Sequence, residues 1–461
     1  MQSSNQYRIE RDSLGEIKVP KTAYYGAQTQ RAIDNFQISG KRLPKSFIKA
    51  QGIIKASAAV TNMELEMLSK TTGEAIIKAA EEVIQGKWDD QFVVDIYQAG
   101  AGTSQNMNIN EVIAHRASEI LDGTLESHRV HPNDHVNLTQ STNDTFHAAI
   151  HIAALELMNQ QLLPSIKDLH KALEKISIEL MPIRKSGRTH LHDAVPMRLG
   201  QEFSAYAETI KTMYEHIQAT ADPLYEIGLG GNAIGTRMNL PPAYIPKIIK
   251  EVSNRTNLPF REPPNMFQFM QNTNAPIRTM LALKELSIHL IKITSDLRLL
   301  ASGPRTGLAE ISLPSVQPGS TIMPGKVNPA ILEMTHMVCC QVIGYEAAIA
   351  TAGIAGQLEI NVMMPFIAHA FLESIELLSN TISTLVTKCI SGIQGNEEIC
   401  NKYMHESLAL VTALSPIMGY DRAAEIGKQA DEKNITIKQI LQEKNLLTRE
   451  IEKALNPEGM V

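Results

Sequence analysis

A polar loop at residues 318–329, PGSTIMPGKVNP, carries the side chains of clearest chemical use in the chain. Its three prolines exclude a regular helix or a central strand, because proline lacks the backbone N–H that both structures use. Gly319 and Gly325 allow close approaches that residues with a side chain resist. The loop displays two hydroxyls, an ammonium and an amide, those of Ser320, Thr321, Lys326 and Asn328. This set of donors is typical of a site for a small anion.

A phosphate-binding loop of the Walker A type does not fit the spacing of this stretch. That loop needs four residues between its glycines and a serine or threonine directly after the lysine. Here five residues separate Gly319 from Gly325, and Val327 follows Lys326. A surface turn that happens to hold a lysine remains the alternative, since loops commonly carry such residues.

The stretch HPNDHVNLTQSTND, residues 131–144, predicts a helix start and a second place for an anion. It ends in Ser141, Thr142 and Asn143, where a long apolar period begins. Such residues cap helix N-termini, which is a purely structural explanation. The free N–H groups of the same helix N-terminus can also bind an anion.

Two shorter polar stretches add further donors. GAGTSQNMNINE, residues 100–111, offers Thr103 among asparagines and small residues, and GRTHLHD, residues 187–193, offers Thr189 and His190. A lone histidine is more often structural than catalytic, but a neighbouring hydroxyl and glycine favour a role of His190 in chemistry. Together the loops present many uncharged donors and a single lysine, which suits a small dicarboxylate.

The sequence indicates no cofactor. It contains no cofactor-binding loop, no metal-ligand spacing and no catalytic Cys–His pattern, so we expect neither a metal nor another cofactor. The four cysteines, at 339, 340, 389 and 400, fit neither a metal site nor a disulfide framework. The chemistry would then depend on acid, base and electrostatic stabilisation alone.

Composition limits the partners and the compartment. The net charge of -6 argues against a nucleic-acid partner and an anionic membrane. The first residues, MQSSNQYRIERDSLGE, lack the apolar segment of a signal peptide. We also find no uninterrupted apolar run of the about eighteen residues that a membrane span needs. We therefore expect a cytoplasmic protein with neither a membrane nor a nucleic-acid partner.

Helical periodicity dominates the remaining sequence. Apolar residues recur three, four or seven apart over 143–180, 275–301 and roughly 358–389, with Pro164 and Pro365 expected to kink or divide the first and third segments. Several such long helices in one chain predict a bundle with nearly aligned axes. Some segments are apolar on more than one side, which indicates either a central helix or packing between subunits. We favour subunit packing. There is little strand signal.

The loop GSTIMPGKVNP resembles the signature loop of the fumarase–aspartase superfamily. Four more blocks match in the family's order, GAGTSQNMNINEV, HPNDHVNLTQSTND, GRTHLHDAVPMRLGQEF and LASGPRTGLAEISLP. The resemblance covers nearly the whole chain and implies an all-α fold in three parts. These would be an N-terminal helical domain (1–139), a central long-helix bundle (140–395) and a small C-terminal helical domain (396–461). It also implies a homotetramer in which bundles pack together and each active site takes loops from three subunits.

The resemblance implies a reaction and a role for each site residue. The reaction is the anti elimination that forms fumarate from a four-carbon dicarboxylate, or its reverse. Ser320 matches the catalytic base, and His190 and Glu333 match a pair that holds water or assists the leaving group. The substrate would be held by Thr103, Ser141, Thr142, Asn143, Thr189, Thr321, Lys326 and Asn328. A secondary dicarboxylate site would comprise His131, Asn133 and Asp134, for which a simple turn is the alternative.

The leaving group divides the family, and the sequence resembles both sides. GAQTQR (26–31), VCCQV (338–342) and residues 406–426 resemble fumarases, which hydrate fumarate to L-malate. Tyr25, Ala101, STND and AGQLEINVMMP resemble aspartases, which release ammonia from L-aspartate. We favour the class II fumarase and keep the aspartase as the alternative. A non-catalytic structural member of the superfamily is a remote third possibility. Three substitutions have no assigned role, at His147, Asn232 and Arg237.

Overall fold

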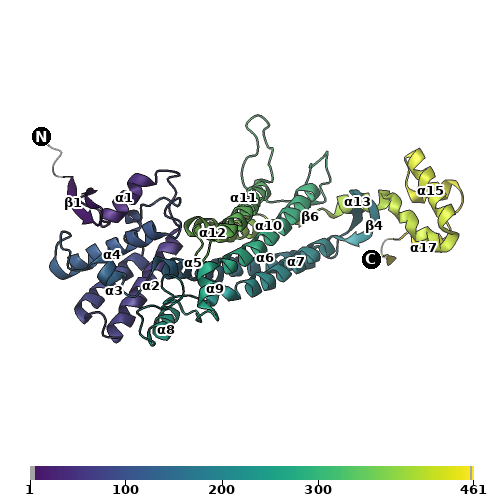
Figure 1. The fold of residues 1–461 in the computed structure, drawn as a ribbon. Helices are drawn as coiled ribbons and strands as arrows, with labels where there is room; N and C mark the ends of the chain where they lie inside the picture. Colours follow the sequence, from purple (N-terminus) through teal and green to yellow (C-terminus); the bar gives the residue numbers. More distant parts are fainter. Residues whose placement is uncertain (1–5, 457–458, 461) are drawn as a thin grey trace. The chain divides into compact units, whose positions relative to one another are not determined.

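The computed structural model describes residues 6–456, 459 and 460 of the 461-residue chain, and these residues are mostly helical (Figure 1). The expected all-α class is confirmed. The chain forms two compact units, each assembled from separate stretches. Unit 1 comprises Met1–Leu163, Glu215–Glu285 and Cys340–Leu378, and unit 2 comprises Pro164–Tyr214, Leu286–Cys339 and Ser379–Val461. The division into three domains at 139/140 and 395/396 stays a prediction.

Unit 1 opens with an antiparallel hairpin of β1 (Tyr7–Asp12) and β2 (Gly15–Pro20), in which Tyr7 pairs with Pro20 and Asp12 with Gly15. Helices follow, namely α1 (Ala27–Asn35), α2 (Lys45–Glu64), α3 (Lys70–Ile84), α4 (Thr103–Asp122), α5 (Thr142–Leu157), α8 (Tyr244–Thr256) and α9 (Met266–Gln271). Every residue of α5 from Asp144 to Leu157 is buried, so α5 is the central helix of this core.

Unit 2 contains α6 (Leu163–Leu180) and an antiparallel hairpin of β3 (Arg184–Thr189) and β4 (His192–Arg198). A two-residue pair joins β5 (Ile311–Ser312) to β6 (Gln394–Gly395). The C-terminal part holds α13 (Glu397–Glu406), α14 (Ser415–Met418), α15 (Tyr420–Lys433), α16 (Ile437–Glu443) and α17 (Arg449–Ala454). A separate apolar cluster that includes Leu414, Ile426 and Ile440 packs α14, α15, α16 and α17 together.

Four long helices contribute residues to both units, α7 (Leu199–Thr220), α10 (Asn274–Leu300), α11 (Ala330–Ile354) and α12 (Met364–Lys388). Polar pairs join neighbouring helices within each unit. In unit 2 the Tyr206 hydroxyl of α7 donates to Asp296 of α10 at 2.8 Å. In unit 1 Lys284 of α10 lies 2.6 Å from Glu346 of α11. These contacts agree with the long-helix bundle expected from the apolar periodicity.

The predicted helix limits are close to the observed ones. The segment 275–301 is α10, and the segment 143–180 is divided at Met158–Leu162, a π-helical turn that ends two residues before Pro164. The third segment differs, because Pro365 is the second residue of α12 and begins the helix instead of interrupting it. Proline is tolerated in a first turn, where its missing N–H has no intrahelical partner to lose.

Helix α11 is the one described helix long and apolar enough to cross a membrane by length and composition alone. The sequence alone did not indicate such a helix, because Glu333, His336 and Glu346 interrupt any continuous apolar run. Its most apolar 18-residue window has a mean hydropathy of 1.5, yet only 28% of that window is buried within the chain. Much of an apolar surface on α11 is therefore left uncovered by this chain.

Candidate active site

The loop around Ser320 in unit 2 is held closed by its own backbone. The N–H of Gly319 donates to the carbonyl of Lys326 at 2.7 Å, and the Asn328 side-chain amide donates to the carbonyl of Gly319 at 2.6 Å. A Cβ on Gly319 would meet the Asn328 nitrogen at 2.5 Å, so the close approach requires glycine. The predicted loop is confirmed as a structure of defined shape.

Within this loop the Ser320 hydroxyl oxygen accepts hydrogen bonds from two backbone amides. The donors are the N–H groups of Ile322, at 3.2 Å, and Met323, at 3.0 Å. Two amides aimed at one oxygen stabilise negative charge on it, as in an oxyanion hole. The arrangement therefore lowers the free energy of a Ser320 alkoxide relative to the alcohol.

A cavity of about 990 Å³ lies beside this loop in unit 2. Its lining includes Lys326, Asn328 and Glu333, which the sequence analysis had selected, together with Arg298 and Asn396. Glu333 stands in the first turn of α11 and lies 3.8 Å from the Arg298 guanidinium of α10. A lysine, an arginine and an amide around one cavity suit a carboxylate ligand.

The stretch expected as a loop at 187–193 lies instead in the β3–β4 hairpin. Its register pairs Thr189 with His192, so His190 and Leu191 form a two-residue turn. Both have left-handed backbone angles, φ 54° and φ 60°. Such turns usually carry asparagine or glycine, which is why the sequence did not indicate a hairpin. His190 is exposed at this turn, and its role in the chemistry stays a prediction.

Buried charges anchor the hairpin to the rest of unit 2. Lys185 is 1% exposed and lies 2.7 Å from Glu202 and 2.9 Å from Glu310, whose side chain is fully buried. Arg188 donates to both carboxylate oxygens of Glu310 at 2.9 Å. A buried carboxylate between two cations fixes the strand that leads to Thr189 and His190. This network was not predicted from the sequence. The position of Glu310 between apolar Ala309 and Ile311 is the one feature of the sequence that could have indicated a buried carboxylate.

In unit 1 the residues expected at a helix start are there. Ser141 is the N-cap of α5, and its hydroxyl accepts a hydrogen bond from the backbone N–H of Asn143 at 3.3 Å. The carboxylate of Asp144 accepts in return from the backbone N–H of Ser141 at 3.1 Å, which completes a capping box. Asp144 also accepts from the amides of Gly230 and Asn232. Burial raises the pKa of Asp144 to about 7, against the opposing effect of these hydrogen bonds. Asn232, to which the sequence assigned no role, has a left-handed backbone conformation (φ 62°) and donates its backbone N–H to Asp144 at 2.9 Å.

A buried lysine brings the starts of α4 and α5 together. Lys55 of α2, 1% exposed, donates to three side-chain carbonyls at 3.0 Å, those of Asn106, Asn137 and Gln140. Asn106 lies in the first turn of α4, which Thr103 begins, and Gln140 directly precedes Ser141. Lys55 therefore positions the elements that carry the selected residues of unit 1. Sequence reasoning did not find it, because its burial depends on tertiary packing.

The possible secondary site forms a tight turn. His131 precedes a π-helical turn at Pro132–Val136, and its Nδ1 accepts from the amides of Asn133 at 3.3 Å and Asp134 at 3.1 Å. These contacts favour the alternative of a structural turn, although all three side chains remain exposed.

The two other unassigned residues have structural explanations. His147 is buried in α5 with its ring 4.4 Å from that of Phe269, and burial lowers its pKa well below the usual value. Arg237 is exposed and forms an ion pair with Glu262. Neither adds a charge among the selected residues.

Within one chain the residues selected from the sequence are divided between the two units. Unit 1 carries Thr103 and Ser141–Asn143 at neighbouring helix starts, whereas unit 2 carries the Ser320 loop, Glu333 and the hairpin with Thr189 and His190. Within the described part of unit 2, the lining of the 990 Å³ cavity includes neither Thr189 nor His190. Their roles as one site stay a prediction.

Comparisons of the sequence and of the structure with known proteins agree on one family. A family model described as lyase matches residues 15–344, and a model described as fumarase C C-terminus matches residues 410–461. An aspartate ammonia-lyase from Bacillus sp. is 45% identical over 98% of this chain and 97% of its own length. A class II fumarate hydratase from Nitrosomonas europaea is 44% identical over 94% of both chains. The crystal structure of a class II fumarase from Schistosoma mansoni superimposes with a TM-score of 0.95, at 36% identity, over 98% of this chain and 99% of that one.

Replacement of Gly319 by alanine tests whether the loop depends on its close approach. The added Cβ would clash with backbone atoms of Asn328 and Lys326 and open the loop. We expect hydrogen exchange of the Ile322 and Met323 amides, measured by mass spectrometry, to become at least about tenfold faster. The control is Gly427→Ala, where a Cβ meets Val411 only at 3.5 Å or more. Exchange in Gly319→Ala equal to the parent would mean that the loop is held by other contacts.

Proposed function

The chain belongs to this lyase family, and on that premise we propose that it is a class II fumarate hydratase, which interconverts L-malate with fumarate and water. Relatives with this activity cover nearly the whole chain. The match of residues 410–461 to the fumarase C C-terminus supports a hydratase, and the ammonia-lyase relative spans most of the same region. Release of ammonia from L-aspartate is the second candidate, since a relative with that name is equally similar.

The observation that carries the proposal is the pair of amides at the Ser320 oxygen. The reaction removes a proton from the carbon beside a carboxylate, where protons are very weakly acidic. A serine can take that proton only as an alkoxide, which is a high-energy form in water. The Ile322 and Met323 amides offset part of that energy and make Ser320 a competent base. Removal of the proton leaves an aci-carboxylate, whose charge needs stabilisation in turn.

Binding of the dicarboxylate is assigned to the other selected residues. Lys326, Asn328 and Thr189 would hold the carboxylate that becomes the aci-carboxylate, with Thr321 beside them. The starts of α4 and α5, with Thr103, Ser141, Thr142 and Asn143, would hold the other carboxylate through hydroxyls, amides and backbone N–H groups. Lys326 then faces the charge that grows in the transition state, which is where a cation lowers the barrier.

His190 and Glu333 complete the proposed machinery at the leaving group. The imidazolium, oriented by the carboxylate, can give a proton to the departing hydroxide, which leaves as water, and in the reverse direction the imidazole can take a proton from the water that attacks fumarate. In this proposal the reaction needs no metal or other cofactor, because acid, base and fixed charges supply each step.

We also propose a homotetramer in which each active site combines loops of three subunits. Support comes from α11, whose apolar window is only 28% buried in one chain, and from the exposed hairpin turn at His190. Apolar surface of this kind is usually covered by a partner. The proposal retains three domains (1–139, 140–395, 396–461) and a cytoplasmic protein, with a small dicarboxylate as its substrate and neither nucleic acid nor a membrane as a partner.

Replacement of Ser320 by alanine tests the base. The glycines, prolines and Lys326 of the loop remain, so substrate binding should survive while turnover of L-malate, followed by fumarate absorbance, falls by several orders of magnitude. The control is Ser383→Ala, the same change at an exposed serine of α12 that does not line the cavity, and it should retain parental turnover. A Ser320→Ala turnover within about tenfold of the parent, a loss of only ~1.4 kcal/mol, would exclude Ser320 as the base. A parent inactive on both L-malate and L-aspartate would indicate the non-catalytic role instead.

Subunit complementation tests the shared site. Ser320→Ala and Thr189→Ala tetramers, each inactive, are dissociated together and reassembled. If the two loops of one site come from different subunits, some mixed tetramers contain a site with neither lesion, and part of the activity returns. Each variant reassembled alone is the control. Mixed tetramers without any recovered activity would place both loops in one subunit.

A further inference from the structure

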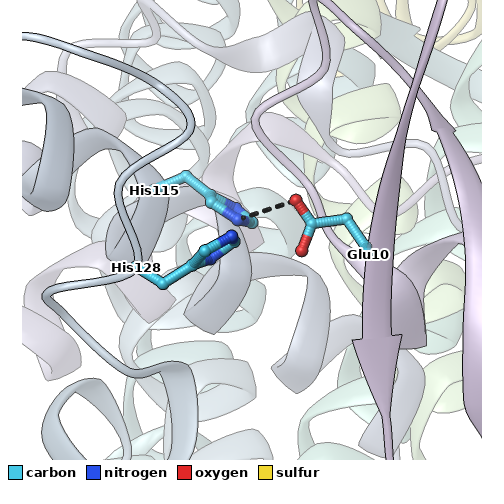
Figure 2. Close-up of side chains that lie close together, drawn as sticks. All are labelled: Glu10, His115 and His128. Atoms are coloured by element: carbon cyan, nitrogen blue, oxygen red, sulfur yellow. Dashed lines mark ion pairs between the residues drawn. The ribbon is translucent and has the colours of Figure 1, made fainter.

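Three side chains from separate stretches of the sequence converge in unit 1, and none of them is among the residues assigned to catalysis. Glu10 lies on β1, His115 on α4, and His128 on the segment that follows α4 (Figure 2). One ligand atom from each lies within 4.8 Å of the other two. Among the described residues this is the one such group of three or more histidine, cysteine or carboxylate side chains. We propose that Glu10, His115 and His128 bind a divalent transition-metal ion, with Zn²⁺ as the preferred occupant.

The tautomer of His115 supports a cation at this point. Its Nδ1 lies 2.8 Å from the carbonyl oxygen of Tyr24, and a carbonyl can only accept, so Nδ1 carries a proton. In the neutral ring Nε2 therefore carries no proton and presents a lone pair. This nitrogen lies 3.4 Å from Oε1 of Glu10. Two acceptors that face one another need a proton or a metal ion between them. Fixing the tautomer through the other nitrogen is also how proteins orient metal-binding histidines.

Glu10 is a charged and oriented ligand. The side chain is 7% exposed, and the Arg8 Nε donates to its Oε1 at 2.6 Å. The Arg8 guanidinium beside it stabilises the ionised carboxylate whatever the state of His115. Oε1 faces both Arg8 and His115, so the carboxylate is oriented toward the point where the metal ion is proposed to lie.

Arg8 also limits how tightly a cation would bind. Its guanidinium donates to the carbonyls of Ala23 at 2.5 Å and Tyr25 at 2.8 Å, so it is fixed in place beside Glu10. A cation at Glu10 therefore experiences the repulsion of a neighbouring positive charge. The expected site is one of moderate affinity that joins the β1–β2 hairpin to α4, and it takes no part in the reaction.

His128 provides the route of entry and the last ligand. Its side chain is exposed, and its ring lies 5.7 Å from that of His115 in an edge-on arrangement. Metal–nitrogen bonds of roughly 2.0–2.1 Å require the ligand atoms to draw closer than 4.8 Å, and an exposed side chain can make that movement.

The ligand set selects the class of metal. Two imidazoles with one carboxylate suit Zn²⁺, Co²⁺ and Ni²⁺ and leave positions open to water. Ca²⁺ and Mg²⁺ prefer sites made wholly of oxygen atoms.

Titration of the tag-free, full-length enzyme tests the site. The protein is stripped with a chelator, desalted and titrated with Zn²⁺ by calorimetry and with Co²⁺ by visible absorption. We expect one equivalent per chain and a higher unfolding midpoint with Zn²⁺. His128→Ala and Glu10→Gln should each weaken binding at least tenfold and lose the rise in midpoint. His405→Ala, which removes an exposed histidine of α13, is the matched control and should bind like the parent.

Two results would overturn the proposal. The first is the absence of saturable binding near one equivalent per chain, which would leave a proton on His115 as the partner of Glu10. The second is binding by His128→Ala as tight as that by the parent, which would locate the bound metal elsewhere.

Discussion

The constraint on which the rest of the molecule depends is that one chain does not cover its most apolar helix. Only 28% of the apolar window of α11 is buried, although its mean hydropathy of 1.5 is that of a core or membrane segment. The large side chains of Met337 and Ile354 are 67% and 83% exposed. Apolar surface on this scale favours association. Glu333 and the Ser320 loop stand at the start of the same helix, so association would also bring other subunits to the proposed base.

Each group of polar loops is positioned by a buried lysine. Lys55 holds Asn106, Asn137 and Gln140 in unit 1, and Lys185 holds Glu202 and Glu310 in unit 2. Removing an ammonium from water is costly unless oxygen atoms replace its hydration. Burial lowers the pKa of Lys55 to about 7, whereas nearby Asp144 acts to raise it. The hydrogen bonds and ion pairs of these buried lysines account for the rigidity that a site built from exposed loops requires.

Sequence reasoning succeeded where the signal was local. The limits of α10, the Ser141 cap and the closed loop at Gly319 follow from periodicity, capping residues and glycines, which act over a few positions. It failed at the β3–β4 hairpin, because the turn at His190 and Leu191 lacks the residues that such turns favour. It also missed Lys55, whose burial depends on distant parts of the chain, and the convergence of Glu10, His115 and His128.

The identity of the leaving group is tested most directly by one competition experiment. The enzyme is incubated with fumarate in D₂O that contains ammonium, and the products are followed by proton NMR. The account predicts L-malate with a single deuterium at C3, placed by anti addition, and no accumulation of aspartate. Aspartate formed faster than malate would contradict the hydratase and establish the ammonia-lyase.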